Sequence, residues 1–288
     1  SSTSRGLGDV YKRQEMEDVL GRPQRILDIS PVEALVAGSK VLITGAGGTI
    51  GSELARQVAS LQPKEIIIVD NSEFLIYQID LALNESYPQI KRRVILGDVR
   101  DKIKLQTLMS KALPDIVIHS AALKHVPLVE SNPIEGIHTN VLGTWNVAEA
   151  VLQNNVKTMV LISTDKAVDP TNIMGLTKRM AESICQSLDA DYKKKTRFVI
   201  VRFGNVLGST GSVIPLFERQ IATGGPLTVT HPEMTRYFMT VKEAVSLVLQ
   251  AAALSRSQNI SETGGISVLE MGKPCLLYTS PSPRDVEE

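Results

Sequence analysis

Several features that mark other protein classes are scarce in this sequence. It has two cysteines, Cys185 and Cys275, too few for a disulfide framework or a cysteine-rich metal site, so we predict no metal and a reducing compartment. The 31 basic and 31 acidic residues balance, so electrostatics offer no case for nucleic acid as a partner. No run approaches the ~18 uninterrupted apolar residues of a spanning helix, so we expect this chain to need no membrane contact.

Both ends of the chain look foreign. Residues 4–14 and 275–285 resemble translated sequencing adapter, and the DNA encoding residues 9–14 can be chosen so that its opposite strand encodes residues 275–280. We therefore predict that residues 1–14 and 275–288 are non-native tails and that the natural sequence continues beyond both. The remainder suffices for one large domain, with room for a small substrate lobe.

Residues 40–54 run from a short apolar segment through three glycines into a helical pattern. The glycines let the backbone turn sharply and approach a bulky group closely. A helix beginning near Thr49 would aim unpaired N–H groups and its positive dipole end at phosphates. We expect a dinucleotide pyrophosphate at this turn, bound by Thr44, Gly45, Gly48, Thr49, Ile50 and Gly51.

A second buried strand, residues 65–70, ends in an acid about 20 residues after the glycine turn. Asp70 can accept hydrogen bonds from the adenosine ribose, and its charge repels a 2′-phosphate, so we expect NAD rather than NADP. The alternative is that Asp70 caps the helix expected over residues 72–83. A nucleoside-triphosphate loop is disfavoured because Gly51 is followed by Ser-Glu and not by Lys and a hydroxyl residue.

Beyond the glycine turn, apolar strands alternate with amphipathic helices, which predicts an α/β fold with a doubly wound parallel sheet. We expect strands over residues 93–96, 115–119, 158–163 and 197–202, and helices over residues 133–153 and 172–188. Asp98 and Val99 follow one strand, and Asp98 either bonds the adenine amino group or caps the next helix. Small residues at Ala121 and Ala122 would let a cofactor lie close. Gly143 and Trp145 are expected to pack, and residues 224–229 to form a turn and short strand.

The order and spacing of these motifs resemble extended short-chain dehydrogenases that act on nucleotide sugars. The motifs are Thr44-Gly45-x-x-Gly48-x-x-Gly51, Asp70, Gly97-Asp98, Ala121-Ala122, Ser163-Thr164 and Lys178. Residues 122–127, 163–175 and 202–208 are similar, more narrowly, to the polysaccharide-biosynthesis UDP-N-acetylglucosamine 4,6-dehydratases. The resemblance covers essentially residues 17–274 and implies a Rossmann-type sheet with a smaller C-terminal lobe, an NAD cofactor, a UDP-sugar substrate and a homo-oligomer.

The resemblance also implies a division of the chain. We expect a lead-in over residues 15–39, an NAD-binding Rossmann domain over residues 40–204 and a truncated substrate-binding lobe over residues 205–274. Residues 17–22 resemble the lead-in of long, membrane-anchored members. This chain is therefore expected to be the cytoplasmic catalytic domain of an inner-membrane protein.

Catalytic roles follow from the same resemblance. The wider superfamily has a tyrosine base four residues before the active-site lysine, but Lys178 has Met174 at that position, and a thioether cannot act as a base. Thr164 can orient the sugar C4 hydroxyl, and Lys178 can hold the nicotinamide ribose. We assign Asp165 as the acid and Lys166 as the base of an elimination, which requires a partly neutral Lys166. The alternative is a solvated Asp165–Lys166 pair at a strand end.

Four further residues are candidates for the substrate. Lys124 and His125 can reach the sugar or cofactor phosphates, although a lone histidine is more often structural. Asn205 and Arg236 are candidates for the UDP diphosphate, since a guanidinium grips a diphosphate bidentately. A surface ion pair is the alternative for Arg236, and Arg202, at the end of an apolar strand, can instead be a buried structural partner.

Three functions are compatible with these residues. The first is an NAD-dependent UDP-N-acetylhexosamine 4,6-dehydratase, favoured by Asp165-Lys166 and Met174 and acting in surface polysaccharide or glycan synthesis. The second is a nucleotide-sugar 4-epimerase or reductase, for which a tyrosine is expected at position 174. The third is a non-catalytic NAD-binding protein of the same fold, which retention of Asp165, Lys166 and Lys178 disfavours.

Overall fold

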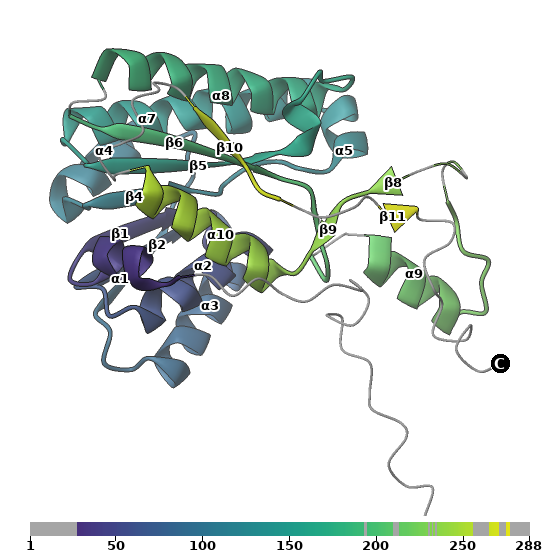
Figure 1. Cartoon of the computed structure of the whole chain (residues 1–288), viewed down its shortest axis with the longest axis horizontal. Coiled ribbons are helices and arrows are strands. Elements are labelled where there is room, and N and C mark those ends of the chain that lie inside the picture. The colour runs from purple at the N-terminus through teal and green to yellow at the C-terminus, as the bar shows by residue number, and fades with distance from the viewer. Residues whose placement is uncertain are drawn as a thin grey trace, which may run out of the picture.

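The computed structural model describes residues 28–192, 195–209, 213–229, 231, 233, 235–255, 265–270 and 275–276. Within these residues, a seven-stranded parallel sheet has the order β10-β6-β5-β4-β1-β2-β3 (Figure 1). Its strands are β1 (Lys40–Thr44), β2 (Glu65–Asp70), β3 (Arg92–Leu96), β4 (Ile116–His119), β5 (Thr158–Thr164), β6 (Arg197–Phe203) and β10 (Ile266–Val268). The winding reverses between β1 and β4, as in dinucleotide-binding domains. The predicted doubly wound sheet is confirmed.

Helices cover both faces of the sheet. One face carries α1 (Ser30–Val36), α2 (Thr49–Ser60), α3 (Glu73–Ser86) and α10 (Val241–Leu254). The other carries α4 (Lys102–Ala112), α7 (Gly143–Gln153) and α8 (Ile173–Tyr192), as Figure 1 shows. Each layer contributes its own hydrophobic cluster, so the central strands are buried on both sides. All six residues of β2 are buried, which explains their nearly unbroken apolar run.

The helical stretch expected over residues 133–153 is present but is not one regular α-helix. It consists of α6 (Pro133–Gly136), a π-helical segment, η2 (Ile137–Leu142), and α7. The wider turn breaks the 3.6-residue period, and such segments often occur at functional sites. A β-carbon at Gly143 would lie 2.7 Å from Val99 Cγ2, which confirms a packing role for this glycine, whereas Trp145 is 44% exposed.

A smaller lobe extends from the sheet, on the right in Figure 1. It contains β7 (Asn205–Val206) paired with β9 (Phe238–Met239), α9 (Val213–Ala222), and β8 (Thr235–Arg236) paired with β11 (Cys275–Leu276). Between β9 and β11 the chain returns to the larger domain, where α10 packs on the sheet and β10 pairs with β6. The predicted division at residue 204 does not include this return.

The prediction of a turn and a short strand over residues 224–229 is confirmed for the turn and wrong for the strand. Gly224 lies in a turn after α9, but residues 225–229 have no regular secondary structure. Gly224 and Gly225 have positive φ values of 89° and 77°, and Pro226 has no N–H to donate. Thr228 N donates instead to the side-chain oxygen of Gln220 at 3.1 Å.

The two predicted tails lie almost wholly outside the described residues. Residues 1–14 are not among the described residues, and of the second tail only residues 275–276, in β11, are described. Most of the predicted lead-in also lies outside the described residues. The end of the lead-in forms α1, in which Val32, Leu35 and Val36 are buried. Among the described helices, none is long and apolar enough to cross a membrane.

Candidate active site

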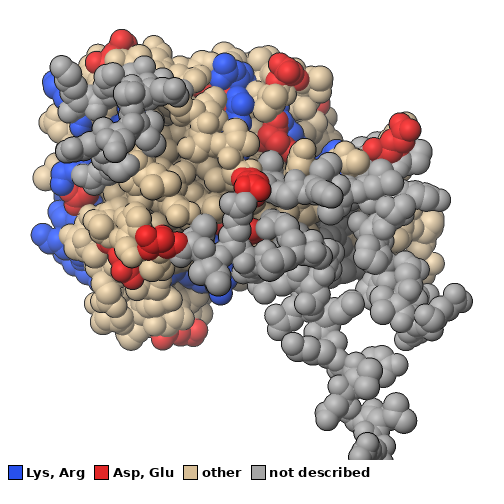
Figure 2. Space-filling view, viewed as in Figure 1, with Lys and Arg blue, Asp and Glu red and all other residues tan. Residues whose placement is uncertain are grey.

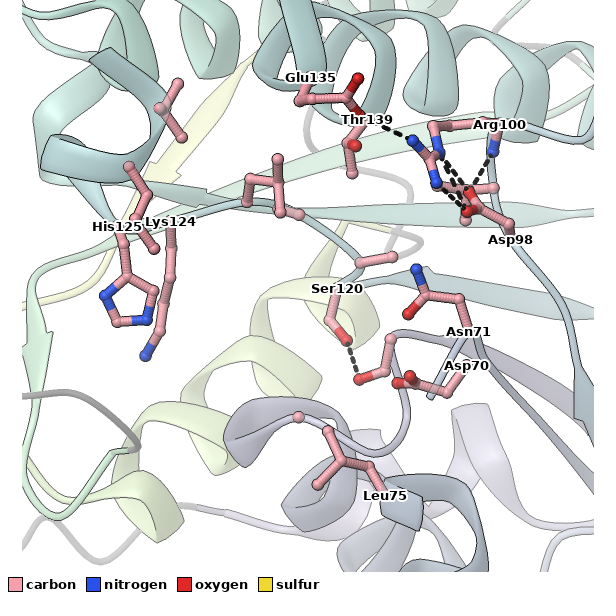
Figure 3. Close-up of a pocket in the computed structure, with 18 of the residues that line it drawn as sticks. Asp70, Asn71, Leu75, Asp98, Arg100, Ser120, Lys124, His125, Glu135 and Thr139 are labelled. Carbon is pink, nitrogen blue, oxygen red and sulfur yellow. Dashed lines mark hydrogen bonds and ion pairs between the residues drawn. The ribbon is translucent and has the colours of Figure 1, made fainter. Parts of the chain in front are cut away.

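A cavity of about 510 Å³ opens at the carboxyl ends of β1, β2 and β4, where the winding of the sheet reverses (Figure 3). In open α/β sheets this is where ligands bind. Of the residues predicted from the sequence, those lining the cavity are Gly45, Gly48, Asp70, Asp98, Val99, Ala121, Ala122, Lys124 and His125. The topology therefore brings together residues from four separate stretches of the chain.

The glycine turn leaves no room for side chains where it meets its neighbours. Gly45 has a φ of 67°, and a β-carbon there would lie 2.5 Å from the backbone N of Ala121. A β-carbon at Gly51 would lie 2.0 Å from the carbonyl oxygen of Gly45. Gly48 begins α2 as its N-cap and lines the cavity. These residues fit a pyrophosphate seated at the positive end of α2.

Asp70 holds this turn against the end of β2. Its Oδ2 accepts a hydrogen bond from Gly47 N at 2.9 Å, and its Oδ1 accepts one from Ser72 N at 2.9 Å. The side-chain cap of α3 is Ser72, whose Oγ accepts from Leu75 N, so the capping alternative for Asp70 is wrong. The carboxylate lies at the cavity wall, beside Asn71 (Figure 3).

Asp98 belongs to an ion-pair network just beyond the end of β3, the strand that neighbours β2. It accepts hydrogen bonds from Arg100, whose Nη2 lies 2.6 Å from Asp98 Oδ2 and whose Nη1 lies 2.9 Å from Glu135 Oε2 (Figure 3). The Arg100 hydrogen bond is the largest cause that lowers the pKa of Asp98. The cap of α4 is Asp101, which accepts from Lys104 N at 2.9 Å, so the capping alternative for Asp98 is wrong. Arg100 and Glu135 were not found from the sequence.

Thr44 and His119 form a buried polar pair beneath the glycine turn. Thr44 Oγ1 lies 2.7 Å from His119 Nδ1, and His119 Nε2 lies 3.1 Å from Thr144 Oγ1. Thr144 donates its hydroxyl proton to Asn140 O at 2.7 Å, so the imidazole must carry its proton on Nε2 and accept from Thr44. Burial lowers the pKa of His119 to about 3, and the ring is therefore neutral.

Asn140, in the π-helical segment, fastens the loop that follows β4. Its Oδ1 accepts from Leu123 N at 2.8 Å, and its Nδ2 donates to Leu123 O at 3.0 Å and to Thr177 Oγ1 at 2.9 Å. The side chain is 1% exposed. Asn140 thus links the loop carrying Ala121 and Ala122 to α8, one residue before Lys178. Nothing in the local sequence marks it, because the π turn is not visible there.

Lys178 is buried behind the end of β5. Its Nζ donates to Ile162 O at 2.6 Å, and burial lowers its pKa to about 8. Met174 precedes it by one turn of α8, on the same face, and is 2% exposed. Met174, at the sequence position where the resemblance predicts a tyrosine base, is therefore buried.

The Thr164-Asp165-Lys166 triplet is joined to Asn205 at the start of the lobe. Asp165 Oδ1 accepts hydrogen bonds from Thr164 Oγ1 at 2.9 Å and from Lys166 Nζ at 3.0 Å. Lys166 Nζ also donates to Asn205 Oδ1 at 3.1 Å. The side chains of Asp165 and Lys166 are 28% and 32% exposed, so the pair is partly buried, and both Asp165 and Asn205 hold the Nζ of Lys166.

Lys124 supplies the neighbouring cation. Burial is the main cause that lowers its pKa, and the charge of Lys166 lowers it further. Lys124 and His125 lie side by side at the wall of the cavity, away from Asp70 and Asp98 (Figure 3). Lys124 follows β4 and Lys166 follows β5, so the ends of these two neighbouring strands place two lysine side chains near each other.

Arg236 is positioned differently from the other candidates. It lies on β8 of the smaller lobe, and its Nη1 donates to the carbonyl of Thr235 at 2.8 Å (Figure 1). In the described part of the chain no carboxylate forms an ion pair with it. Its binding of a diphosphate stays a prediction.

Glu182 is a buried acid that sequence reasoning missed. It is fully buried on α8 and accepts hydrogen bonds from Ser163 Oγ at 2.6 Å and from Arg202 Nε at 2.7 Å. Arg202, for which a structural role was the alternative, thus pairs with a buried acid and is itself 14% exposed. The available signal was a glutamate four residues after Lys178, on the same face of the helix.

Comparison with known proteins agrees with this geometry. A family model described as polysaccharide biosynthesis protein matches residues 41–280. The chain belongs to this family. It is 51% identical over 264 residues to the capsular polysaccharide biosynthesis protein CapD of Staphylococcus aureus, which covers 91% of this chain but 43% of that protein. The chain thus spans less than half the length of this relative.

Other relatives differ in their named reactions. A UDP-N-acetylglucosamine 4,6-dehydratase (inverting) of Campylobacter jejuni is 38% identical over 215 residues, covering 74% of this chain and 63% of that protein. A UDP-glucose 4-epimerase of Rickettsia bellii is 41% identical over 218 residues, covering 73% and 62%. The relatives of this chain thus carry the names of nucleotide-sugar dehydratases and epimerases as well as of a capsular polysaccharide protein.

Solved structures share the fold. The structure of Pen from Bacillus thuringiensis has a TM-score of 0.76 and 35% identity, covering 85% of this chain and 72% of that chain. DesIV, a dTDP-glucose 4,6-dehydratase from Streptomyces venezuelae solved with NAD bound, has a TM-score of 0.71 and 21% identity, covering 82% and 77%. The Rossmann-type fold and the predicted family are both confirmed.

Proposed function

We propose that this chain catalyses the NAD-dependent 4,6-dehydration of a UDP-N-acetylhexosamine, with UDP-N-acetylglucosamine as the first candidate, to a 4-keto-6-deoxy sugar. The observation that carries the proposal is the position of Lys166, whose Nζ is held between Asp165 and Asn205 at the carboxyl edge of the sheet. Family membership and the dehydratase relative support it. The proposal covers the chain described here, and a role in surface polysaccharide synthesis within a membrane-anchored parent rests on the family alone.

The glycine turn and Asp70 would hold NAD, with the pyrophosphate against Gly45, Gly48 and the start of α2. Bound NAD would supply the acceptor for a hydride from the sugar C4 and return that hydride to C6. Lys178, whose Nζ lies against the end of β5 at Ile162 O, would bind the nicotinamide ribose. Asp98 is our candidate for the adenine amino group.

An elimination needs an acid for the departing C6 hydroxyl and a base for the C5 proton. Asp165 and Lys166 share one hydrogen bond of 3.0 Å. Moving its proton from Nζ to the carboxylate converts the ion pair into a carboxylic acid and a neutral amine. Both catalytic forms would arise together without a change in net charge.

The proton balance then closes around the substrate. Asp165 gives its proton to the C6 oxygen, which leaves as water, while Lys166 takes the C5 proton and becomes an ammonium. Thr164 Oγ1 would orient the C4 hydroxyl, and Lys124, His125, Asn205 and Arg236 are the candidates for contacts with the sugar and its diphosphate. Lys166 then gives that proton back to C5 when C6 is reduced. A proton from water, equal to the one that the C4 hydroxyl releases to water on its oxidation, restores the ion pair.

A 4-epimerase is the second candidate because a relative bearing that name is 41% identical. Epimerisation needs no acid and base for C6 and C5, and it preserves the mass of the sugar. The buried Met174, in place of a tyrosine base, favours dehydration.

The test is mass spectrometry of UDP-N-acetylglucosamine after incubation with the full chain and NAD. We expect a product lighter by one water, and its loss in Lys166→Met and Asp165→Asn variants. Lys157→Met is the matched control, because Lys157 Nζ pairs with Asp115 Oδ1 at 2.8 Å away from the predicted catalytic residues. An isomer of unchanged mass would establish the epimerase instead, and NAD binding without any product from UDP-N-acetylhexosamines would refute both.

A further inference from the structure

Glu182 on α8 contacts the ends of two strands: β5, which leads into the predicted catalytic triplet, and β6, which leads to Asn205. Its carboxylate is 0% exposed and accepts hydrogen bonds from Ser163 Oγ at 2.6 Å, Arg202 Nε at 2.7 Å and Arg202 Nη2 at 2.5 Å. Arg179 Nη1 adds a fourth contact at 3.3 Å. A buried charge with this many donors is costly to assemble, and it fixes the relative positions of the groups that bind it.

The groups that Glu182 joins are neighbours in the sheet. Ser163 on β5 and Arg202 on β6 are paired in register. Ser163 immediately precedes Thr164, Asp165 and Lys166, and the chain beyond Arg202 leads to Asn205. The bridge from Lys166 Nζ to Asn205 Oδ1 therefore depends on the spacing of the same two strand ends that Glu182 connects.

Glu182 also faces Lys178, which precedes it by one turn of α8. Burial lowers the pKa of Lys178 to about 8, and the charge of Glu182 opposes this effect. The other titratable groups facing Lys178 are Cys185 on α8 and His119 on β4. Burial raises the pKa of Cys185 to about 12 and lowers that of His119 to about 3, so both are neutral near pH 7. Glu182, which also pairs with Arg202 and Arg179, is thus the anionic neighbour of Lys178 on α8.

We propose that Glu182 is a positioning residue of this active site, which locks the ends of β5 and β6 so that Lys166 meets both Asp165 and Asn205, and whose charge balances the Lys178 ammonium. The first part rests on the proposed dehydratase function. The second part does not rest on that function, because it concerns Lys178 and is tested by measurements of cofactor binding alone.

Two variants separate charge from position. NADH affinity should fall at high pH as Lys178 loses its proton, and we call this fall the pH limb. Glu182→Gln removes the charge, so the pH limb should move about one pH unit lower, because an adjacent anion ordinarily raises the pKa of a cation by about that much. Glu182→Asp retains the charge but shortens the reach to β5 and β6. It should keep the wild-type pH limb, yet lower kcat about tenfold or more with little change in KM, because misplacement by about 1 Å is costly in catalysis.

Asp189→Asn is the matched control. Asp189 is also 0% exposed on α8 and accepts from Phe198 N at 2.9 Å and Arg197 Nη1 at 3.2 Å, so it joins the helix to β6 far from Lys166. We expect this variant to lose stability but to retain the pH limb and kcat. If Glu182→Gln does not fold, Ser163→Ala removes only the bond to β5 and should lower kcat without moving the limb.

The experiment measures NADH binding by fluorescence and product formation by mass spectrometry from pH 6 to 10. Glu182 variants that match Asp189→Asn in both readouts would overturn the proposal. A wild-type chain that binds NADH but forms no dehydrated product would refute the dehydratase function, while the pH limb of NADH binding would still decide the role of Glu182 at Lys178.

Discussion

A methyl group at Gly51 should disrupt the junction between β1 and α2. Its β-carbon would lie 2.0 Å from Gly45 O, 2.7 Å from Gly45 C and 2.8 Å from Ala46 Cα. Ordinary contact begins at 3.4 Å, so α2 would have to move away from the turn by about 1.4 Å. The obstacle is backbone and not the flexible end of a side chain, so rotamer changes cannot relieve it.

The packing of α2 sets the size of the effect. Leu54, Ala55, Val58 and Ala59 on this helix are 0% exposed and pack in the hydrophobic cluster on one face of the sheet. Overpacking of this kind costs about 1–3 kcal/mol, and a backbone obstacle belongs at the upper end. A loss of about 2–3 kcal/mol should lower Tm by about 5–10 °C for a domain of this size.

The assay compares Gly51→Ala with Gly48→Ala by thermal unfolding and NADH binding. A β-carbon at Gly48 would meet nothing nearer than Gly45 O at 3.4 Å, so this variant should unfold within about 1 kcal/mol of wild type. It should still lose NADH affinity, because the methyl group would stand where the pyrophosphate approaches α2. A Gly51→Ala protein with the wild-type Tm would refute the reasoning.

Three further predictions concern buried or cavity-lining polar groups. The folded-state pKa of His119 lies below its ordinary 6.5, so its contribution to stability is complete above pH 6.5 and is lost as pH falls toward 3, by up to about 5 kcal/mol. His119→Asn should therefore weaken the loss of folding free energy at low pH, whereas a change at exposed His125, to Asn, should leave that loss unchanged. Asn140→Ala should lower the free energy of unfolding by about 2–3 kcal/mol, because it leaves Leu123 N and O unpaired, and equilibrium denaturation with Asn146→Ala as control checks this. Asp70→Asn should raise the NADPH-to-NADH affinity ratio by about tenfold in a binding titration, and an unchanged ratio would exclude charge repulsion as the basis of cofactor choice.

Local sequence was sufficient for the main elements. The run over residues 65–70 predicted β2 with its observed bounds, because a parallel strand buried on both faces must be apolar throughout. The glycine turn was equally readable, since Gly45 needs a positive φ and a close approach to Ala121. Asp98 shows the limit of local reasoning. The helix that follows is capped by Asp101, three residues later, and which aspartate caps it depends on where the helix begins.

Long-range contacts account for what sequence reasoning missed. Asn205, which stays a candidate for the diphosphate, contacts Lys166, 39 residues earlier in the chain, and this contact was not predicted. The return of α10 and β10 to the larger domain, and the π turn that aims Asn140 at Leu123, also have no local signature. Each depends on which strands become neighbours.

The sequence by itself determined the parallel α/β fold, the glycine turn and the chemical types available at the strand ends. These follow from burial patterns and backbone requirements that act within about 20 residues of chain. Only the tertiary structure decided which of those groups meet. Glu182 joins Ser163 and Arg202 because β5 and β6 lie side by side under α8, and a hydrogen bond requires its partners to be within about 3 Å in space, whatever their separation in the chain.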